Sequence, residues 1–385
     1  MTPLTTTRQV EELCRELADD PFVAIDTEFM RDRTYWPRLC LIQIAGERHA
    51  AIDPLAPKID LAPLFELLAD QRVLKVFHAA RQDIEIFWRL TGQIPKPLFD
   101  TQLAAMVCGY GEEVAYETLV KQLAKARIDK SSRFTDWARR PLSAQQLEYA
   151  LADVIHLRVV YQRLQEQLAK TGREGWVAQE LSVLANPRTY EQPPEEAWKR
   201  LKMRSRDRRF LAIARELAGW REREAQRRDL PRNRIVRDDL LLEIAANRPT
   251  SVEQLTGLRR ISLDRSGAAA AVEAVRRALA IPEAELPELE QPVRLPRGVG
   301  PVVDLLRVLL KSRCEEHRVA QRLVATTSDL EAIAAEDAPD VPALEGWRLE
   351  VFGRSALELK RGELGLAVRD GQVGIVPMAG PAPQA

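Results

Sequence analysis

Residues 22–29 read FVAIDTEF, an apolar run that carries two acids at its end. The run follows Asp20–Pro21 and has the length and composition of a buried strand. Side chains alternate between the faces of a strand, so Asp26 and Glu28 share one face. Two like charges 4 Å apart repel by roughly 4 kcal/mol at an effective dielectric of about 20. We therefore expect a cation to balance these acids.

Further apolar runs follow along the chain. Residues 38–46 and 48–53 predict two more strands, with Gly46 in the turn between them, and residues 72–78 predict another after a helix. Three sequential strands followed by helix, strand and helix predict a mixed sheet flanked by helices. The pair of acids would lie on its first strand.

Two later segments bring further acids to helices. Asp83 lies in FHAARQDIEIF, and Tyr149 and Asp153 lie in LEYALADVIHL, on a helix for which Ser143 is a candidate N-cap. Because Tyr149 and Asp153 are four residues apart, they stack on one helical face. Oxygen ligands without a Cys or His cluster favour Mg²⁺ or Mn²⁺ over zinc.

Length and composition describe a globular protein of two or three domains. The chain has 385 residues, 45% hydrophobic and 30% charged, with 57 basic and 57 acidic side chains. Its four cysteines form no CxxC pair, so a disulfide framework or a zinc ribbon is not expected. This cysteine usage fits a reducing cytoplasm. We read no export signal and no membrane anchor.

Two proline-rich segments, 185–198 and 281–298, divide the chain. We expect a first domain, built on the mixed sheet, over residues 1–205, followed by helical units over residues 206–288 and 296–378. The helical patterns beyond both segments indicate that these units are related small domains.

A local basic segment runs from Arg200 to Arg234. It predicts a groove for a phosphate backbone, and we name Arg204, Arg206 and Arg208 as RNA-binding candidates. The alternative is a solvated helix face with ion pairs.

Among the aromatic residues, Phe29 and Trp137 are candidates to contact a terminal nucleotide, although Trp137 could equally anchor a loop. Asp100 could be a fifth metal ligand, but helix capping is favoured because capping uses such an Asp. For His78 we favour a structural cap over a place in the cleft.

Three motifs in order, AIDTEF, FHAARQDIEIF and EYALADV, resemble those of the ribonuclease D family, in the DEDD exonuclease superfamily. A tyrosine four residues before the last aspartate is the mark of the DEDDy subtype. Residues 219–249 are similar to the helical HRDC domain of this family, and parts of the last eighty residues resemble a second one. The resemblance implies an α/β ribonuclease-H-like exonuclease core followed by two small all-helical domains.

The resemblance also implies a mechanism. Two divalent ions, Mg²⁺ or Mn²⁺, would support hydrolysis of RNA from a free 3′ end to nucleoside 5′-monophosphates, with tRNA precursors as substrates. By the family pattern Asp26 bridges both ions, Glu28 and Asp153 hold the water-bearing ion, and Asp83 supports the other. Tyr149 would orient the attacking water. No membrane and no obligate protein partner are implied.

Two other functions stay open at this point. A 3′-to-5′ DNA exonuclease is one, because related cores with the same helical appendage process DNA. The other is an RNA-binding scaffold without catalysis. The intact acids argue against a scaffold, because a pure binder has no need for a costly acid cluster.

Overall fold

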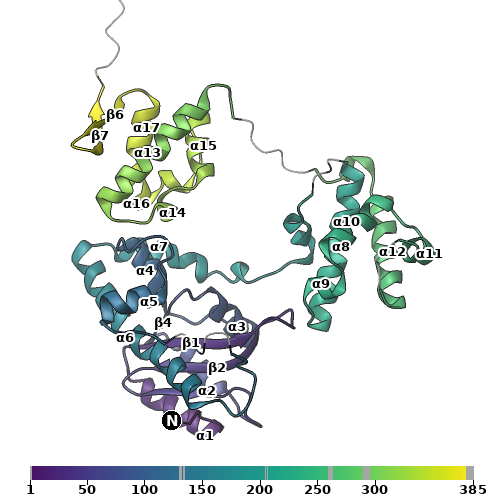
Figure 1. Ribbon diagram of the computed structural model, residues 1–385, viewed down its shortest axis with the longest axis horizontal. Helices are drawn as coiled ribbons and strands as arrows, with labels where there is room; N and C mark the ends of the chain where they lie inside the picture. Colours follow the sequence, from purple (N-terminus) through teal and green to yellow (C-terminus); the bar gives the residue numbers. More distant parts are fainter. Residues whose placement is uncertain are drawn as a thin grey trace, which may run out of the picture.

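The computed structural model describes residues 2–129, 132, 135–203, 205, 207–258, 263–288 and 295–378. A five-stranded sheet forms the centre of the N-terminal domain, in the order β3-β2-β1-β4-β5 (Figure 1). The strands are β1 (Phe22–Met30), β2 (Arg38–Ala45), β3 (His49–Ile52), β4 (Leu74–Phe77) and β5 (Leu98–Asp100). β1 and β2 pair antiparallel, as do β2 and β3, whereas β4 and β5 pair parallel to their neighbours. This confirms the mixed sheet, although β5 was not predicted.

The helices of this domain cover both faces of the sheet. They are α1 (Thr7–Leu17), α2 (Ala62–Ala69), α3 (Arg81–Thr91), α4 (Thr101–Val107), α5 (Tyr116–Leu119), α6 (Ala144–Thr171) and α7 (Glu174–Leu184). On one face Ile25 and Ile42 of the sheet share a core with α1, α2 and α3. On the other face Leu41 and Ala51 pack against α6. Ser143 caps α6 through a capping box with Gln146, as predicted.

The first helical unit follows a connecting stretch with two 3₁₀ turns, Pro187–Thr189 and Pro194–Arg200. Its helices are α8 (Arg208–Arg228), α9 (Arg232–Ile235), α10 (Asp238–Asn247), α11 (Val252–Thr256) and α12 (Arg265–Ala280). They enclose a separate hydrophobic core that includes Leu217, Leu241 and Val275. In Figure 1 this unit lies to the right of the sheet, with α9 facing the long loop between β1 and β2.

The second unit contains α13 (Val299–His317), α14 (Gln321–Val324), α15 (Thr327–Ala335), α16 (Gly346–Arg348) and α17 (Arg354–Lys360). It departs from the all-helical expectation, because β6 (Leu364–Arg369) and β7 (Gln372–Pro377) form an antiparallel hairpin. Asp370 and Gly371 both have positive φ, 50° and 76°, between these strands. An Asp-Gly pair with this geometry is a preferred two-residue hairpin turn.

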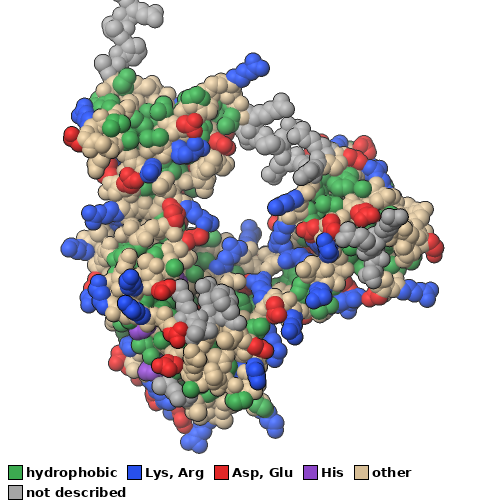
Figure 2. Space-filling view, viewed as in Figure 1, with side chains coloured by type: hydrophobic (Ala, Val, Ile, Leu, Met, Phe, Trp, Pro, Cys, Tyr) green, Lys and Arg blue, Asp and Glu red, His purple; other side chains and the backbone are tan. Residues whose placement is uncertain are grey.

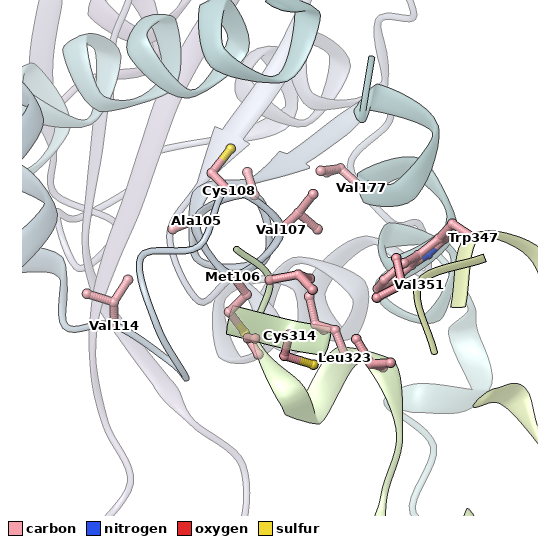
Figure 3. Close-up of a cluster of buried hydrophobic side chains, with 14 of the residues drawn as sticks. Ala105, Met106, Val107, Cys108, Val114, Val177, Cys314, Leu323, Trp347 and Val351 are labelled. Carbon is pink, nitrogen blue, oxygen red and sulfur yellow. The ribbon is translucent and has the colours of Figure 1, made fainter. Parts of the chain in front are cut away.

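The second unit and the nuclease domain share one hydrophobic core (Figure 3). Met106 and Val107 of α4 lie beside Cys314 and Leu323 of the second unit in this core. Trp347 stacks on Trp176 of α7, with ring centroids 4.4 Å apart and an interplanar angle of 10°. The second unit is therefore docked on the nuclease domain by apolar packing.

Within the part of the chain that the structure describes, no helix is long and apolar enough to span a bilayer.

Candidate active site

Three carboxylates converge between the sheet and α6. Asp26 and Glu28 extend from β1, and Asp153 lies on α6; one ligand oxygen of each lies within 4.8 Å of the others. The pairing of β1 with β2 shifts register between Glu28 and Phe29. A bulge at such a place re-aims side chains, and here it directly follows the second acid. This acidic cluster could hold a metal ion.

Asp83 lies beside this group but outside it. It occupies the first turn of α3, is 6% exposed, and accepts a hydrogen bond from the Thr27 hydroxyl. Thr27 lies between Asp26 and Glu28, and its side chain faces the other side of β1. Sequence reasoning placed Asp83 with the other acids, and the structure holds it next to Asp26 through this threonine.

Burial and mutual repulsion favour the protonated forms of these acids. Burial raises the pKa of Asp26 to about 6. Burial, followed by repulsion from Asp26, raises the pKa of Asp153 to about 8. The same two causes raise the pKa of Asp83 well above its ordinary value. A bound cation would reverse this preference, since a metal ion is the largest local charge in such a site.

Tyr149 stands one turn before Asp153 on α6. Burial and the carboxylates of Asp153 and Glu28 raise the pKa of its hydroxyl above the usual value near 10. The Tyr149 hydroxyl therefore stays protonated at neutral pH and acts as a hydrogen-bond donor. Trp137 packs beside it with ring centroids 6.1 Å apart and is 2% exposed. That burial leaves Trp137 little ring surface for the RNA contact predicted for it and fits the alternative of an anchor.

A cavity of about 340 Å³ opens beside the acids and is lined by residues from several elements. Tyr116 of α5 lines it and donates a hydrogen bond from its hydroxyl to the backbone carbonyl of Asp153. Gln102 of α4 lines it as well. Sequence reasoning missed both residues. Tyr116 lies in a short segment, EVAYETL, whose pattern gives no sign that it returns to the sheet.

His78 also lines the cavity, so the structural cap favoured for it is wrong: the N-cap of α3 is Ala80. The Thr101 hydroxyl donates its proton to the Phe77 carbonyl (3.0 Å) and so must accept from the His78 Nδ1–H (3.0 Å). This relay corresponds to the Nδ1–H tautomer of the neutral ring. Burial lowers the pKa of His78, which keeps the ring neutral.

Asp100 is the N-cap of α4, which confirms the favoured prediction. Its carboxylate accepts hydrogen bonds from the backbone N–H groups of Gln102 and Leu103. It also accepts from the backbone N–H groups of Ala79 and Ala80. Asp100 thus ties the start of α3 to the start of α4.

The predicted RNA-binding arginines divide into two cases. Arg204 and Arg206 lie outside the described residues. Arg208 donates to the Leu286 carbonyl (2.8 Å) and pairs with Glu288 (3.3 Å).

Phe29, the other aromatic candidate, is half-buried near the end of β1. It packs against the core that the sheet shares with α1, α2 and α3.

Much of the basic segment is neutralised by acids nearby. Further ion pairs involve Arg200, Arg209, Arg221, Arg223, Arg227, Arg228 and Arg232. On the visible face of the first helical unit, basic and acidic side chains are interspersed (Figure 2). These pairs favour the alternative of a paired helix face over a continuous phosphate groove.

Comparison with known proteins gives the class of this chain. A sequence model described as a 3′-5′ exonuclease matches residues 1–169, and one of the HRDC domain matches residues 210–268. The matched domain has a mixed sheet, with acids on its first strand and on α6. The chain is therefore a 3′-5′ exonuclease with a helical C-terminal region.

Full-length relatives give the family. Ribonuclease D of Nitrobacter hamburgensis is 50% identical over 377 residues, covering 97% of this chain and 98% of the relative. Ribonuclease D of Acidiphilium cryptum is 50% identical over 379 residues, with 97% of each chain covered. The crystal structure of Escherichia coli RNase D, an exoribonuclease involved in structured RNA processing, matches with a TM-score of 0.80 and 31% identity, covering 94% of this chain and 99% of that one. The chain belongs to the ribonuclease D family of 3′-5′ exoribonucleases.

Proposed function

We propose that this enzyme hydrolyses phosphodiester bonds at the 3′ end of structured RNA, tRNA precursors included, and releases nucleoside 5′-monophosphates. The observation that carries this proposal is the convergence of Asp26, Glu28 and Asp153 within 4.8 Å beside a cavity. The Escherichia coli enzyme is an exoribonuclease involved in structured RNA processing, and it aligns over nearly the whole chain, which supports the substrate class.

The donor set fits two divalent cations, Mg²⁺ or Mn²⁺. All candidate ligands are carboxylate oxygens, which such hard cations prefer. Bound there, the ions would acidify a water and stabilise charge on the phosphoryl group and the leaving 3′ oxygen. Asp26 would serve both ions, Glu28 and Asp153 one of them, and Asp83 the other.

The remaining residues would act on the substrate and the water. Tyr149 carries a hydroxyl that stays protonated, so we assign it to orienting the attacking water as a donor. Tyr116 and His78 have ring centroids 5.0 Å apart at the cavity wall. They offer aromatic surface for the terminal nucleotide, and base stacking on such surface tolerates any sequence.

We also propose that residues 296–378 form a second HRDC-type domain. Both helical units begin with a long helix that ends in a left-handed cap, Asp229 in the first and Arg318 in the second. In each unit a single-turn helix and then a longer helix begin at the same spacing from that cap. The hairpin of β6 and β7 is an addition to the second unit.

Digestion of end-labelled RNA tests the proposed activity. With 5′-labelled RNA and Mg²⁺ or Mn²⁺, we expect a ladder that shortens from the 3′ end, and with 3′-labelled RNA immediate release of a labelled mononucleotide. Asp153→Ala should remove both signals while the protein stays folded. A matched DNA strand serves as the comparison; faster digestion of DNA, or wild-type activity of the Asp153→Ala protein, would overturn the proposal.

A further inference from the structure

Gln43 is a buried polar residue without a hydrogen-bond partner. It lies in the middle of β2 and has no exposed surface. Neither its amide nitrogen nor its amide oxygen has a partner among the described residues. Unpaired buried amides are costly and uncommon, and each one calls for an explanation.

Another buried polar side chain of the same sheet shows the contrast. Lys75 of β4 is also fully covered, but its ammonium donates to the backbone carbonyls of Asp70 (2.7 Å) and Val73 (2.6 Å) and to that of Lys96. The fold therefore supplies acceptors where a buried polar group serves structure alone.

The position of Gln43 indicates what it serves. The strand register pairs Gln43 directly with Asp26 of β1 and, on the other side, with Ala51 of β3. Directly opposed residues of an antiparallel pair share a face, with Cβ atoms about 4.5–5.5 Å apart. Gln43 thus lies beside Asp26, on the face that α6 covers.

Apart from the acids of the cluster, the neighbours on this face are apolar. Ala51 belongs to a cluster with Ala150 and Leu151 of α6, and the next cross-strand pair along the sheet joins Ala24 to Ala45. These side chains offer the amide no hydrogen bond. Asp26 is the polar side chain directly opposite Gln43 in the sheet.

A carboxylate that binds a cation needs donors to hold it in one orientation. Asp26 accepts a backbone hydrogen bond at Thr27. Each carboxylate oxygen has two lone pairs, so an oxygen that binds a cation can still accept one N–H. A second donor would fix the orientation of the carboxylate toward the cation, as outer partners of metal ligands commonly do.

We propose that Gln43 is a positioning residue, which donates its amide N–H to the Asp26 carboxylate when that carboxylate holds metal. The inference rests on the proposed function, in which Asp26 is a metal ligand. In the metal-free protein the amide is a liability for stability. Its benefit is an Asp26 carboxylate held in one orientation for the cation.

The test compares two variants at this position, Gln43→Met and Gln43→Leu, with Ile42→Val. Both apolar residues approximate the glutamine volume and remove the unpaired amide. Ile42 is the neighbouring residue of β2, but it belongs to the core on the opposite face of the sheet. Ile42→Val therefore controls for a general disturbance of the strand. Asp26→Asn controls for the metal site itself.

Three measurements are made on each full-length protein: thermal melting without metal, Mn²⁺ binding by calorimetry, and single-turnover cleavage of labelled RNA. We expect both Gln43 variants to melt at or above the wild-type temperature, yet to bind Mn²⁺ about tenfold more weakly. Cleavage at limiting Mn²⁺ should fall by a similar factor and recover in part at saturating Mn²⁺. Ile42→Val should lower the melting temperature and leave Mn²⁺ affinity unchanged.

Wild-type Mn²⁺ affinity in either Gln43 variant would overturn the inference, and so would a drop in melting temperature larger than that of Ile42→Val in both. The proposed function fails separately: wild-type protein that binds no Mn²⁺, or Asp26→Asn protein that binds it normally, would show that Asp26 holds no metal.

Discussion

Asp229 and Arg318 occupy the same place in the two helical units, and both contact the nuclease domain. Each is the left-handed cap after the first helix of its unit, with φ of 50° and 49°. The Asp229 carboxylate accepts the backbone N–H groups of Tyr35 (3.1 Å) and Trp36 (3.0 Å). The Arg318 backbone lies against Gly109. Each unit therefore contacts the nuclease domain through the residue that caps its first helix, and the two contacts lie at separate sites.

The first docking site predicts that Tyr35→Phe loosens the first helical unit. Tyr35 is 5% exposed, and its hydroxyl donates to Glu222, which has no exposed surface and also pairs with Arg232. Removing one donor to a buried carboxylate should lower the free energy of unfolding by about 1–3 kcal/mol. Urea unfolding measures this loss, and hydrogen exchange over α8 locates it.

Tyr110→Phe is the matched control for this site. The Tyr110 hydroxyl bonds Gln167 within the nuclease domain (3.0 Å), where it is only partly buried. Loss of the Tyr110 hydroxyl should lower the free energy of unfolding by less than loss of the Tyr35 hydroxyl, and it should leave hydrogen exchange in α8 unchanged. Equal exchange in α8 for the Tyr35 and Tyr110 variants would speak against docking through Glu222.

The acidic cluster predicts that the metal-free protein loses stability as pH rises. Folding raises the pKa of Asp153 from 3.8 to about 8 and that of Asp26 to about 6. Between pH 4 and 8 these two acids therefore bind more protons in the folded protein than in the unfolded chain, and their contribution to the free energy of unfolding falls as pH rises. Urea midpoints from pH 5 to 8.5 in EDTA should show this fall.

Divalent metal should reverse this trend, because the ions bind the ionised carboxylates and stabilise the folded state more as pH rises. Asp153→Asn should make the metal-free slope shallower, since the neutral amide cannot ionise. If the curves of urea midpoint against pH run parallel in Mg²⁺ and in EDTA, the carboxylates do not bind the ion.

Tyr149→Phe should reduce turnover without weakening RNA binding. The pKa of Tyr149 is raised by burial and by nearby carboxylates, so the wild-type hydroxyl does not ionise in the working range. We expect the variant to lower kcat by about 10²-fold or less, KM to stay the same, and the shape of the pH–rate profile to be unchanged. Steady-state kinetics from pH 6 to 9.5 provide the check. An alkaline limb that disappears in the variant would instead identify Tyr149 as a base.

Local patterns were sufficient for much of the site. The alternation in FVAIDTEF placed Asp26 and Glu28 on one face, and the four-residue spacing placed Tyr149 above Asp153. The position of Asp83 required a contact that no local pattern contains, the hydrogen bond from Thr27 on another element. Gln43 reads in the sequence as one polar residue in the apolar run LCLIQIA, and only the strand register sets it opposite Asp26.

Other features escaped prediction for reasons of length and distance. β5 is three residues long, too short for a period of two to be visible. Some arginines of the segment 200–234 pair with acids that are distant in the sequence, as Arg208 does with Glu288 and Arg209 with Glu283. A charge count along the chain therefore overstated how basic this surface is.

The second docking site predicts that Gly109→Ala separates the second helical unit from the nuclease domain. Gly109 has φ of +83°, and a Cβ there would lie 2.5 Å from the Arg318 carbonyl oxygen, a backbone atom that cannot rotate away. Gly92 is the matched control, because it has φ of +71° with nothing within 4 Å of the added Cβ. Both substitutions carry the left-handed strain of about 1–2 kcal/mol, and only Gly109→Ala adds the clash.

We expect Gly109→Ala to lower the free energy of unfolding by clearly more than Gly92→Ala does. The backbone hydrogen bond from Ala320 to the Met106 carbonyl (3.0 Å) crosses the same interface, so exchange at the Ala320 amide should rise in the Gly109 variant alone. Equal losses of stability with a protected Ala320 amide would mean that the interface absorbs the added methyl group. In that case the apolar core around Met106 and Trp347, rather than the close approach at Arg318, would fix the second unit in place.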